Sequence, residues 1–134
     1  MGPVSIGEDC DIGPGVVILP STSIGDSARI GPHSEVRNSI IMNDARVGSG
    51  AIISDSVVGA SSILGDQMVV ESGPCVVEVE EAFLRAEFGA ILSDNVTAGA
   101  RVMSHAGTVV GSGARIDSGC AIRGNIERES RVMG

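Results

Sequence analysis

The segment from residue 6 to residue 35 decides the fold, because it reads as five consecutive six-residue units: IGEDCD, IGPGVV, ILPSTS, IGDSAR and IGPHSE. Isoleucine opens every unit, glycine is usually second, and a small or β-branched residue is usually fifth. Apolar residues that recur every six positions match neither the period of an α-helix nor that of an ordinary strand. Such a repeat is typical of a solenoid, in which each coil packs on its neighbours.

The repeat continues beyond residue 35 with two shortened units. Units of five residues begin at Val36 and at Ile53, seventeen positions apart. If three units make one coil, both deletions fall at the same corner of successive coils, which favours a three-sided coil. A last run of units begins at Leu92. The chain holds about seventeen units, which predicts roughly five to six coils and a prism about 25–30 Å tall at the usual strand spacing.

Each position of the unit has an expected role. The first residue should point into the prism and stack on its equivalent one coil away, as Ile12, Ile30 and Val47 would. Glycine in second place is expected because it allows backbone angles that a Cβ hinders. The fifth residue, which is Ile40 in the first short unit, should fit the crowded interior. No coil can bury its apolar face alone, so stability comes from stacking.

The predicted domain, residues 1–134, has four parts. The first coils span 1–69, an insertion spans 70–89, the last coils span 90–126, and a charged cap or tail spans 127–134.

The insertion carries both phenylalanines of the chain, Phe83 and Phe88. Ser72-Gly73-Pro74 signals a turn at its start. Residues 76–80 alternate as in a strand, and residues 80–88 predict a short helix. The insertion either covers an apolar face of its own subunit or packs on a neighbouring subunit. Aromatic residues confined to it favour the second alternative.

Composition excludes several classes of partner. The net charge of −8, with nine arginines and no lysine, would repel nucleic-acid backbones, and the near absence of aromatic residues leaves no base-stacking surface. No stretch approaches the roughly 20 apolar residues of a membrane span. No signal peptide is predicted, and the three scattered cysteines favour a reducing cytoplasm. Acid excess without lysine favours a halophilic source over an ordinary acidic domain.

The order of these segments resembles a known family. The stretches SIGEDCDIGPG, VRNSIIMNDARVG and ISDSVVG, an insertion, and GAILSDNVTAGARVMSHAGTVVGSGARIDSGCAIRG are similar to the C-terminal domain of sugar-1-phosphate nucleotidylyltransferases. Archaeal glucose-1-phosphate thymidylyltransferases and bifunctional uridylyltransferase/glucosamine-1-phosphate acetyltransferases share this layout. The resemblance implies an all-β fold, a left-handed parallel β-helix of about five to six three-sided coils with one insertion near 70–88. It also implies a homotrimer.

The nucleotidyl transfer of this family takes place in an N-terminal domain with a Gly-rich phosphate loop and a metal-binding Asp. Neither feature occurs in this sequence. We therefore expect an excised or separately encoded C-terminal domain, whose partner is the N-terminal nucleotidylyltransferase domain of the parent chain.

The resemblance also locates the acetyltransferase base of the bifunctional members, a histidine just before the segment that matches ISDSVVG. Alignment on Asp55-Ser56-Val57 places Ser49 at that histidine, with Ala51 and Ile52 in place of a Ser and a Tyr. Serine has no pKa near neutrality and cannot act as the base. The insertion also lacks the sugar-binding Asn-Tyr loop. The sequence therefore predicts a lost acetyltransferase base and an assembly or regulatory role.

An acyl-CoA-dependent acetyltransferase that acts on an amino or hydroxy sugar is the alternative. His105 is then the candidate base, and Arg101, Arg115 and Arg123 would pair with the phosphates of acetyl-CoA. The alternative for each of these residues, and for His33, is a solvated surface position, which is the more common one for such residues. Two histidines outside the family spacing argue against the three-histidine zinc site of γ-class carbonic anhydrases, and no metal is predicted. Cys120, at a fifth position, is expected to be a buried packing thiol.

Overall fold

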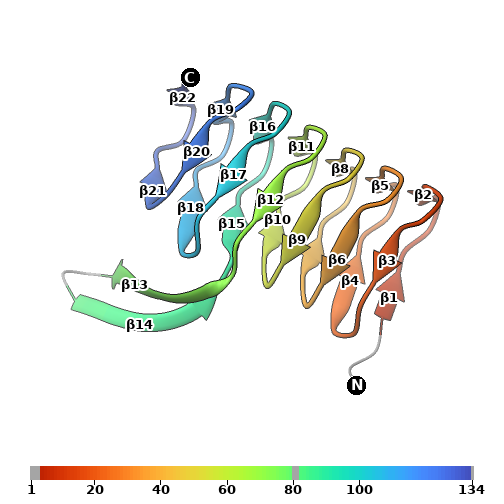
Figure 1. The fold of residues 1–134 in the computed structure, drawn as a ribbon, viewed down its shortest axis with the longest axis horizontal. Helices are drawn as coiled ribbons and strands as arrows, with labels where there is room; N and C mark the ends of the chain where they lie inside the picture. Colours follow the sequence, from red (N-terminus) through yellow and green to blue (C-terminus); the bar gives the residue numbers. More distant parts are fainter. Residues whose placement is uncertain (1–3, 80–81, 134) are drawn as a thin grey trace.

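The computed structural model describes residues 4–79 and 82–133, and they form a three-sided solenoid (Figure 1). Three parallel sheets make the sides, and the chain visits them in the order A, B, C in every coil. Sheet A comprises β1 (Val4–Ile6), β4 (Thr22–Ile24), β7 (Ile40–Ile41), β10 (Val57–Val58), β15 (Ala90–Leu92), β18 (Thr108–Val110) and β21 (Asn125–Ile126).

Sheet B comprises β2 (Asp11–Ile12), β5 (Arg29–Ile30), β8 (Arg46–Val47), β11 (Ile63–Leu64), β16 (Thr97–Ala98), β19 (Arg115–Ile116) and β22 (Arg131–Val132). Sheet C comprises β3 (Val17–Ile18), β6 (Glu35–Arg37), β9 (Ile52–Ser54), β12 (Val69–Val70), β17 (Met103–Ser104) and β20 (Ala121–Ile122). The predicted left-handed parallel β-helix is confirmed, with six full coils and two sides of a seventh. The additional strand β22 lies within the segment expected to be a cap or tail.

Both five-residue units lie at one corner, as expected. The unit from Val36 links β6 to β7, and the unit from Ile53 links β9 to β10, so each joins sheet C to sheet A. The insertion leaves the prism at this same corner, between β12 and β15. We call this corner the CA edge; it consists of residues 19–21, 37–39, 54–56, 71–79, 82–89, 105–107 and 123–124. The corresponding corners after sheets A and B are the AB edge and the BC edge.

First-position residues form the core, as predicted. Ile30 and Val47 are buried, and Ile12, in the first coil, is partly buried against the same core. The prediction for Ile40 was wrong: Ser39 is the buried residue of this unit, with 1% of its surface exposed, whereas Ile40 is 49% exposed. Compared with a six-residue unit, this short unit lacks one residue at the corner but keeps a small residue, Ser39, that points into the prism. The Ser39 hydroxyl donates to the Arg37 carbonyl (2.7 Å) and accepts from the Ser56 amide (3.1 Å), which satisfies it inside the prism.

The role predicted for second-position glycine was also wrong. Positive φ angles fall mainly on the fourth residue of the unit, including Asp44 (φ 61°) and Arg101 (φ 55°), and not on the second. The second residue is glycine because the next coil passes too close for a side chain. A Cβ on Gly31 would lie 2.6 Å from the carbonyl carbon of Gly48, which leaves no space for it.

The helix predicted over 80–88 does not form in its described part. The insertion is an antiparallel hairpin of β13 (Gly73–Val79) and β14 (Ala82–Phe88), paired from Gly73↔Phe88 to Val79↔Ala82. Helix propensity is a weak prior, and the antiparallel partner strand satisfies the backbone of 82–88 instead. The strand predicted over 76–80 is confirmed for 76–79; residue 80 lies outside the described residues. Figure 1 shows the hairpin projecting away from the stack of coils. The structure contains no helix that could cross a membrane among the residues it describes.

Candidate functional site at the CA edge

Side chains with proton-transfer or charge-pairing chemistry gather along the CA edge. At the AB and BC edges the second position of the unit is mostly glycine. At the CA edge none of the six second positions is glycine. Because equivalent positions stack from coil to coil, these residues form one column along the prism: Leu19, Arg37, Ser54, Glu71, His105 and Arg123. Interactions within this column are therefore built into the register of the solenoid.

Asp55 anchors the start of the hairpin to this column. Its carboxylate accepts hydrogen bonds from the Ser72 hydroxyl and from Asn38 Nδ2 (2.8 Å). These two hydrogen bonds, from Ser72 and then Asn38, hold the pKa of Asp55 below its ordinary value of 3.8. Partial burial acts in the opposite direction, and the Arg37 guanidinium lowers the pKa further. Asp55 is therefore a carboxylate near neutral pH and serves as a fixed acceptor at the foot of the hairpin.

Glu71 and His105 form the pair of side chains best arranged for proton transfer. Glu71 Oε2 lies 3.3 Å from His105 Nδ1, and the two side chains are 45% and 31% exposed. The backbone of His105 is fixed, since its amide donates to the Ile122 carbonyl (2.9 Å) and its carbonyl accepts from the Thr108 hydroxyl (2.7 Å). A carboxylate on Nδ1 favours the tautomer that leaves Nε2 to accept a proton. A carboxylate–imidazole pair of this kind can act as an oriented general base.

The sequence identified His105 but missed Glu71. The two residues are 34 positions apart because the hairpin separates adjacent coils, whereas neighbouring coils elsewhere repeat every 16 to 18 residues. Glu71 and His105 are each the second residue of a unit, and alignment of the units before and after the insertion would have shown that they stack.

The predicted arginines lie on different sides of the prism. Arg123 occupies the CA edge one coil after His105, because Ser104 and Ile122 are register partners. Arg115 lies at an outward position of sheet B, beside Arg131, and Arg101 lies at the BC edge. Only Arg123 shares an edge with His105.

Other sequence candidates also lie away from the CA edge. His33 and Ser49 are both at the BC edge, where the Ser49 amide donates to Asp66 Oδ1 (2.9 Å). No three His, Cys, Asp or Glu residues form a possible metal site in the described part of the chain.

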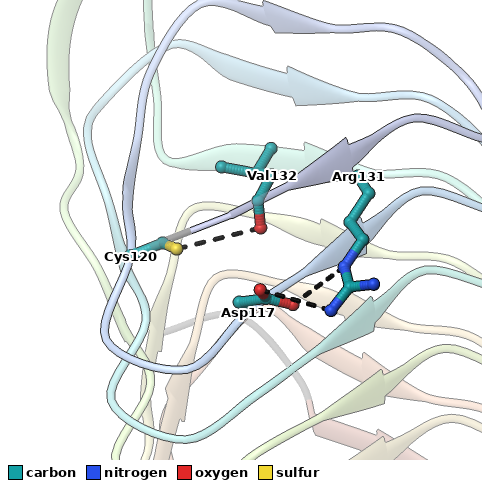
Figure 2. Close-up of polar contacts among 4 residues, drawn as sticks. All are labelled: Asp117, Cys120, Arg131 and Val132. Carbon is teal, nitrogen blue, oxygen red and sulfur yellow. Dashed lines mark hydrogen bonds and ion pairs between the residues drawn. The ribbon is translucent and has the colours of Figure 1, made fainter.

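The last coil carries an exposed ion pair. Arg131 Nε and Nη2 lie 3.3 and 3.5 Å from the two carboxylate oxygens of Asp117 (Figure 2). Cys120 is buried, with its sulfur 3.9 Å from the Val132 carbonyl oxygen. Such an exposed ion pair adds little stability.

A groove of about 290 Å³ borders the CA edge on the side of sheet A. Its walls are mainly apolar and include Ile40, Val57, Ile91 and Phe88, and its polar end holds Asn38 and Asp55. The hairpin foot and sheet A therefore share one depression.

A family model of the GMPPB C-terminal domain matches residues 1–127. The chain belongs to the GMPPB C-terminal domain family. Two bifunctional GlmU proteins are also similar to this chain. The protein from Methanococcus aeolicus is 30% identical over 122 residues, which cover 86% of this chain and 30% of that protein. The protein from Methanococcus vannielii is 30% identical over 128 residues, which cover 90% of this chain and 31% of that protein.

Solved structures confirm the shared fold of this GMPPB C-terminal domain. A putative acetyltransferase from Bacillus cereus has a TM-score of 0.74 at 14% identity, covering 99% of this chain and 74% of that chain. A mutant of AntD, an N-acyltransferase from Bacillus cereus, has a TM-score of 0.78 at 14% identity. The match covers 92% of this chain and 74% of the AntD chain. At this level of identity the likeness concerns the fold alone. The chain spans about a third of the length of the GlmU relatives.

We expect Asp55→Asn to lower the urea midpoint of unfolding near neutral pH. The folded-state pKa of Asp55 is depressed, so its stabilising contribution is present above pH 3.8 and is lost as the pH falls below that value. The deficit of the variant should therefore shrink as the pH falls through this window.

Asp44→Asn is the matched control, because Asp44 also has a positive φ at a corner but lies at the AB edge. Equal midpoints for wild type and Asp55→Asn near neutral pH, or a deficit as large in Asp44→Asn, would contradict an anchoring role for Asp55.

Proposed function

We propose that this GMPPB C-terminal domain is the assembly domain of a sugar-1-phosphate nucleotidylyltransferase of the glucose-1-phosphate thymidylyltransferase kind. It forms a cytoplasmic homotrimer and holds the N-terminal nucleotidylyltransferase domains of the parent chains in a fixed array. The observation that carries the proposal is the match of residues 1–127 to one C-terminal domain family. The GlmU relatives, about a third of whose length this chain covers, support a larger parent protein.

The geometry of the solenoid supports an assembly role. Its interior is filled by aliphatic and small side chains, so we expect binding at the outer faces and edges. A rigid prism with flat sides is well suited to pack against copies of itself.

The oligomeric state tests this proposal. Light scattering coupled to size exclusion should give a molar mass near three times 13.6 kDa. The measurement is made at low and at high salt, because the net charge of −8 opposes association most strongly when it is unscreened. A monomer at micromolar concentration under both conditions would contradict the proposal.

The Glu71–His105 pair favours a second candidate function, acyl transfer from acetyl-CoA to an amino sugar. In this reaction the sugar amine attacks the thioester carbonyl, His105 Nε2 takes the amine proton, and the CoA thiolate leaves. Glu71 would orient His105 through Nδ1 and stabilise its protonated form. Arg123, one coil away, would pair with an anionic part of the coenzyme or the sugar, whereas Arg101 and Arg115 would have to act from other sides of the prism.

Acetyl-CoA turnover with aminosugar-1-phosphates tests this candidate. His105→Ala should reduce kcat about 10²-fold or more, the usual contribution of a general base. Glu71→Gln should reduce kcat less, because the amide can still hold the ring of His105 in place. His33→Ala, at the BC edge, should leave turnover unchanged. No turnover by the wild type, or equal turnover by wild type and His105→Ala, would remove His105 from any such mechanism.

A further inference from the structure

We propose that copies of this chain associate through the two outer faces that flank the CA edge, with sheet A of one copy packed on sheet C of the next. The inference rests on the proposed assembly role and names the surfaces that would carry it. It is argued from the outward residues of the three sheets, from their charge, and from the position of the hairpin.

The outward residues of each sheet form a column, because register partners repeat from coil to coil. The column of sheet A is Ser5, Ser23, Ile40, Val57, Ile91, Val109 and Asn125. That of sheet C is Val17, Glu35, Ile52, Val69, Met103 and Ala121. That of sheet B is Asp11, Arg29, Arg46, Ile63, Thr97, Arg115 and Arg131.

These columns differ in polarity. Four consecutive outward residues of sheet A, from Ile40 to Val109, are aliphatic, and Ile40 and Ile91 are exposed large hydrophobic residues. Sheet C has an equivalent apolar run from Ile52 to Ala121, with Ile52 and Met103 exposed. Continuous apolar stripes of this kind on a protein surface mark association sites. The two stripes lie on either side of the CA edge.

Charge selects the same two faces for a second copy of this chain. The outward column of sheet B carries four arginines and one aspartate, so a contact between two B faces would bring like charges together. The column of sheet A has no charged residue and that of sheet C has only Glu35, whereas that of sheet B has five charged residues. Packing against sheet B would require desolvation of those groups, a cost that the other two faces avoid.

Contact between two different faces has a consequence for symmetry. An A-to-C contact is heterologous, and heterologous contacts close into rings rather than two-fold dimers when the rotation permits. The CA edge would then lie between neighbouring copies. The foot of the hairpin and the groove lined by Ile40, Val57, Ile91 and Phe88 would lie inside the contact. The Glu71–His105 pair would lie beside the contact, where a neighbouring copy can complete a cleft.

Three isoleucines provide a matched test. Ile40, Ile52 and Ile63 all hold outward positions in the middle coils, in β7, β9 and β11, and they are 49%, 41% and 46% exposed. They lie on sheets A, C and B respectively. Each is replaced by glutamate, and the molar mass is measured by light scattering over a concentration series. Circular dichroism melting confirms that each variant is folded.

We expect Ile40→Glu and Ile52→Glu each to shift the population to monomer, with at least a tenfold higher midpoint concentration for assembly, and Ile63→Glu to assemble like the wild type. A monomeric wild type would overturn the assembly proposal and this inference together. An assembled wild type whose assembly survives Ile40→Glu or Ile52→Glu, or is lost in Ile63→Glu, would overturn this inference alone.

Discussion

Close stacking of one coil on the next, in a fixed register, governs the rest of this structure. Backbone amides of each coil donate to carbonyls of the following coil, as Gly31 does to Val47 (2.8 Å) and Gly48 does to Leu64 (2.9 Å). The same register stacks inward aliphatic residues into columns, and at the AB and BC edges it brings most second positions so close to the next coil that glycine is required there. A change in the length of one unit must therefore be confined to a corner, and all such changes occur at the CA edge.

Part of the acidity of the chain follows from this stacking. The Glu8 amide donates to Asp26 Oδ1 (2.9 Å), the Asp26 amide to Asn43 Oδ1 (2.8 Å), and the Ala60 amide to Asp94 Oδ1 (2.8 Å). In each case the side chain of a third-position residue accepts a hydrogen bond from a backbone amide at the same corner of the preceding coil. The sheet ladders give that amide no partner. Carboxylates at the AB edge thus stabilise the corners. This structural role accounts for some acidic residues without reference to salt.

The six-residue period was sufficient to predict the three sides, the inward columns and the common corner of the short units, because one register determines all of them. The predictions were wrong where the repeat is interrupted, and where the backbone path rather than the residue type determines which side chain points inward. The choice between Ser39 and Ile40 depends on which residue of a unit is deleted, and the hairpin strand over 82–88 depends on an antiparallel partner. The Glu71–His105 pair was hidden because the insertion separates two residues that the register brings together.

Disulfide formation between outward positions of adjacent coils tests the register most directly. In a variant lacking the three native cysteines, Arg29→Cys with Arg46→Cys should cross-link readily on mild oxidation, because register partners in adjacent parallel strands lie within the usual Cα separation of a disulfide. Arg29→Cys with Ile63→Cys, two coils apart, should not. Failure of the first pair, or equal cross-linking of both pairs, would contradict the stacked three-sided coil.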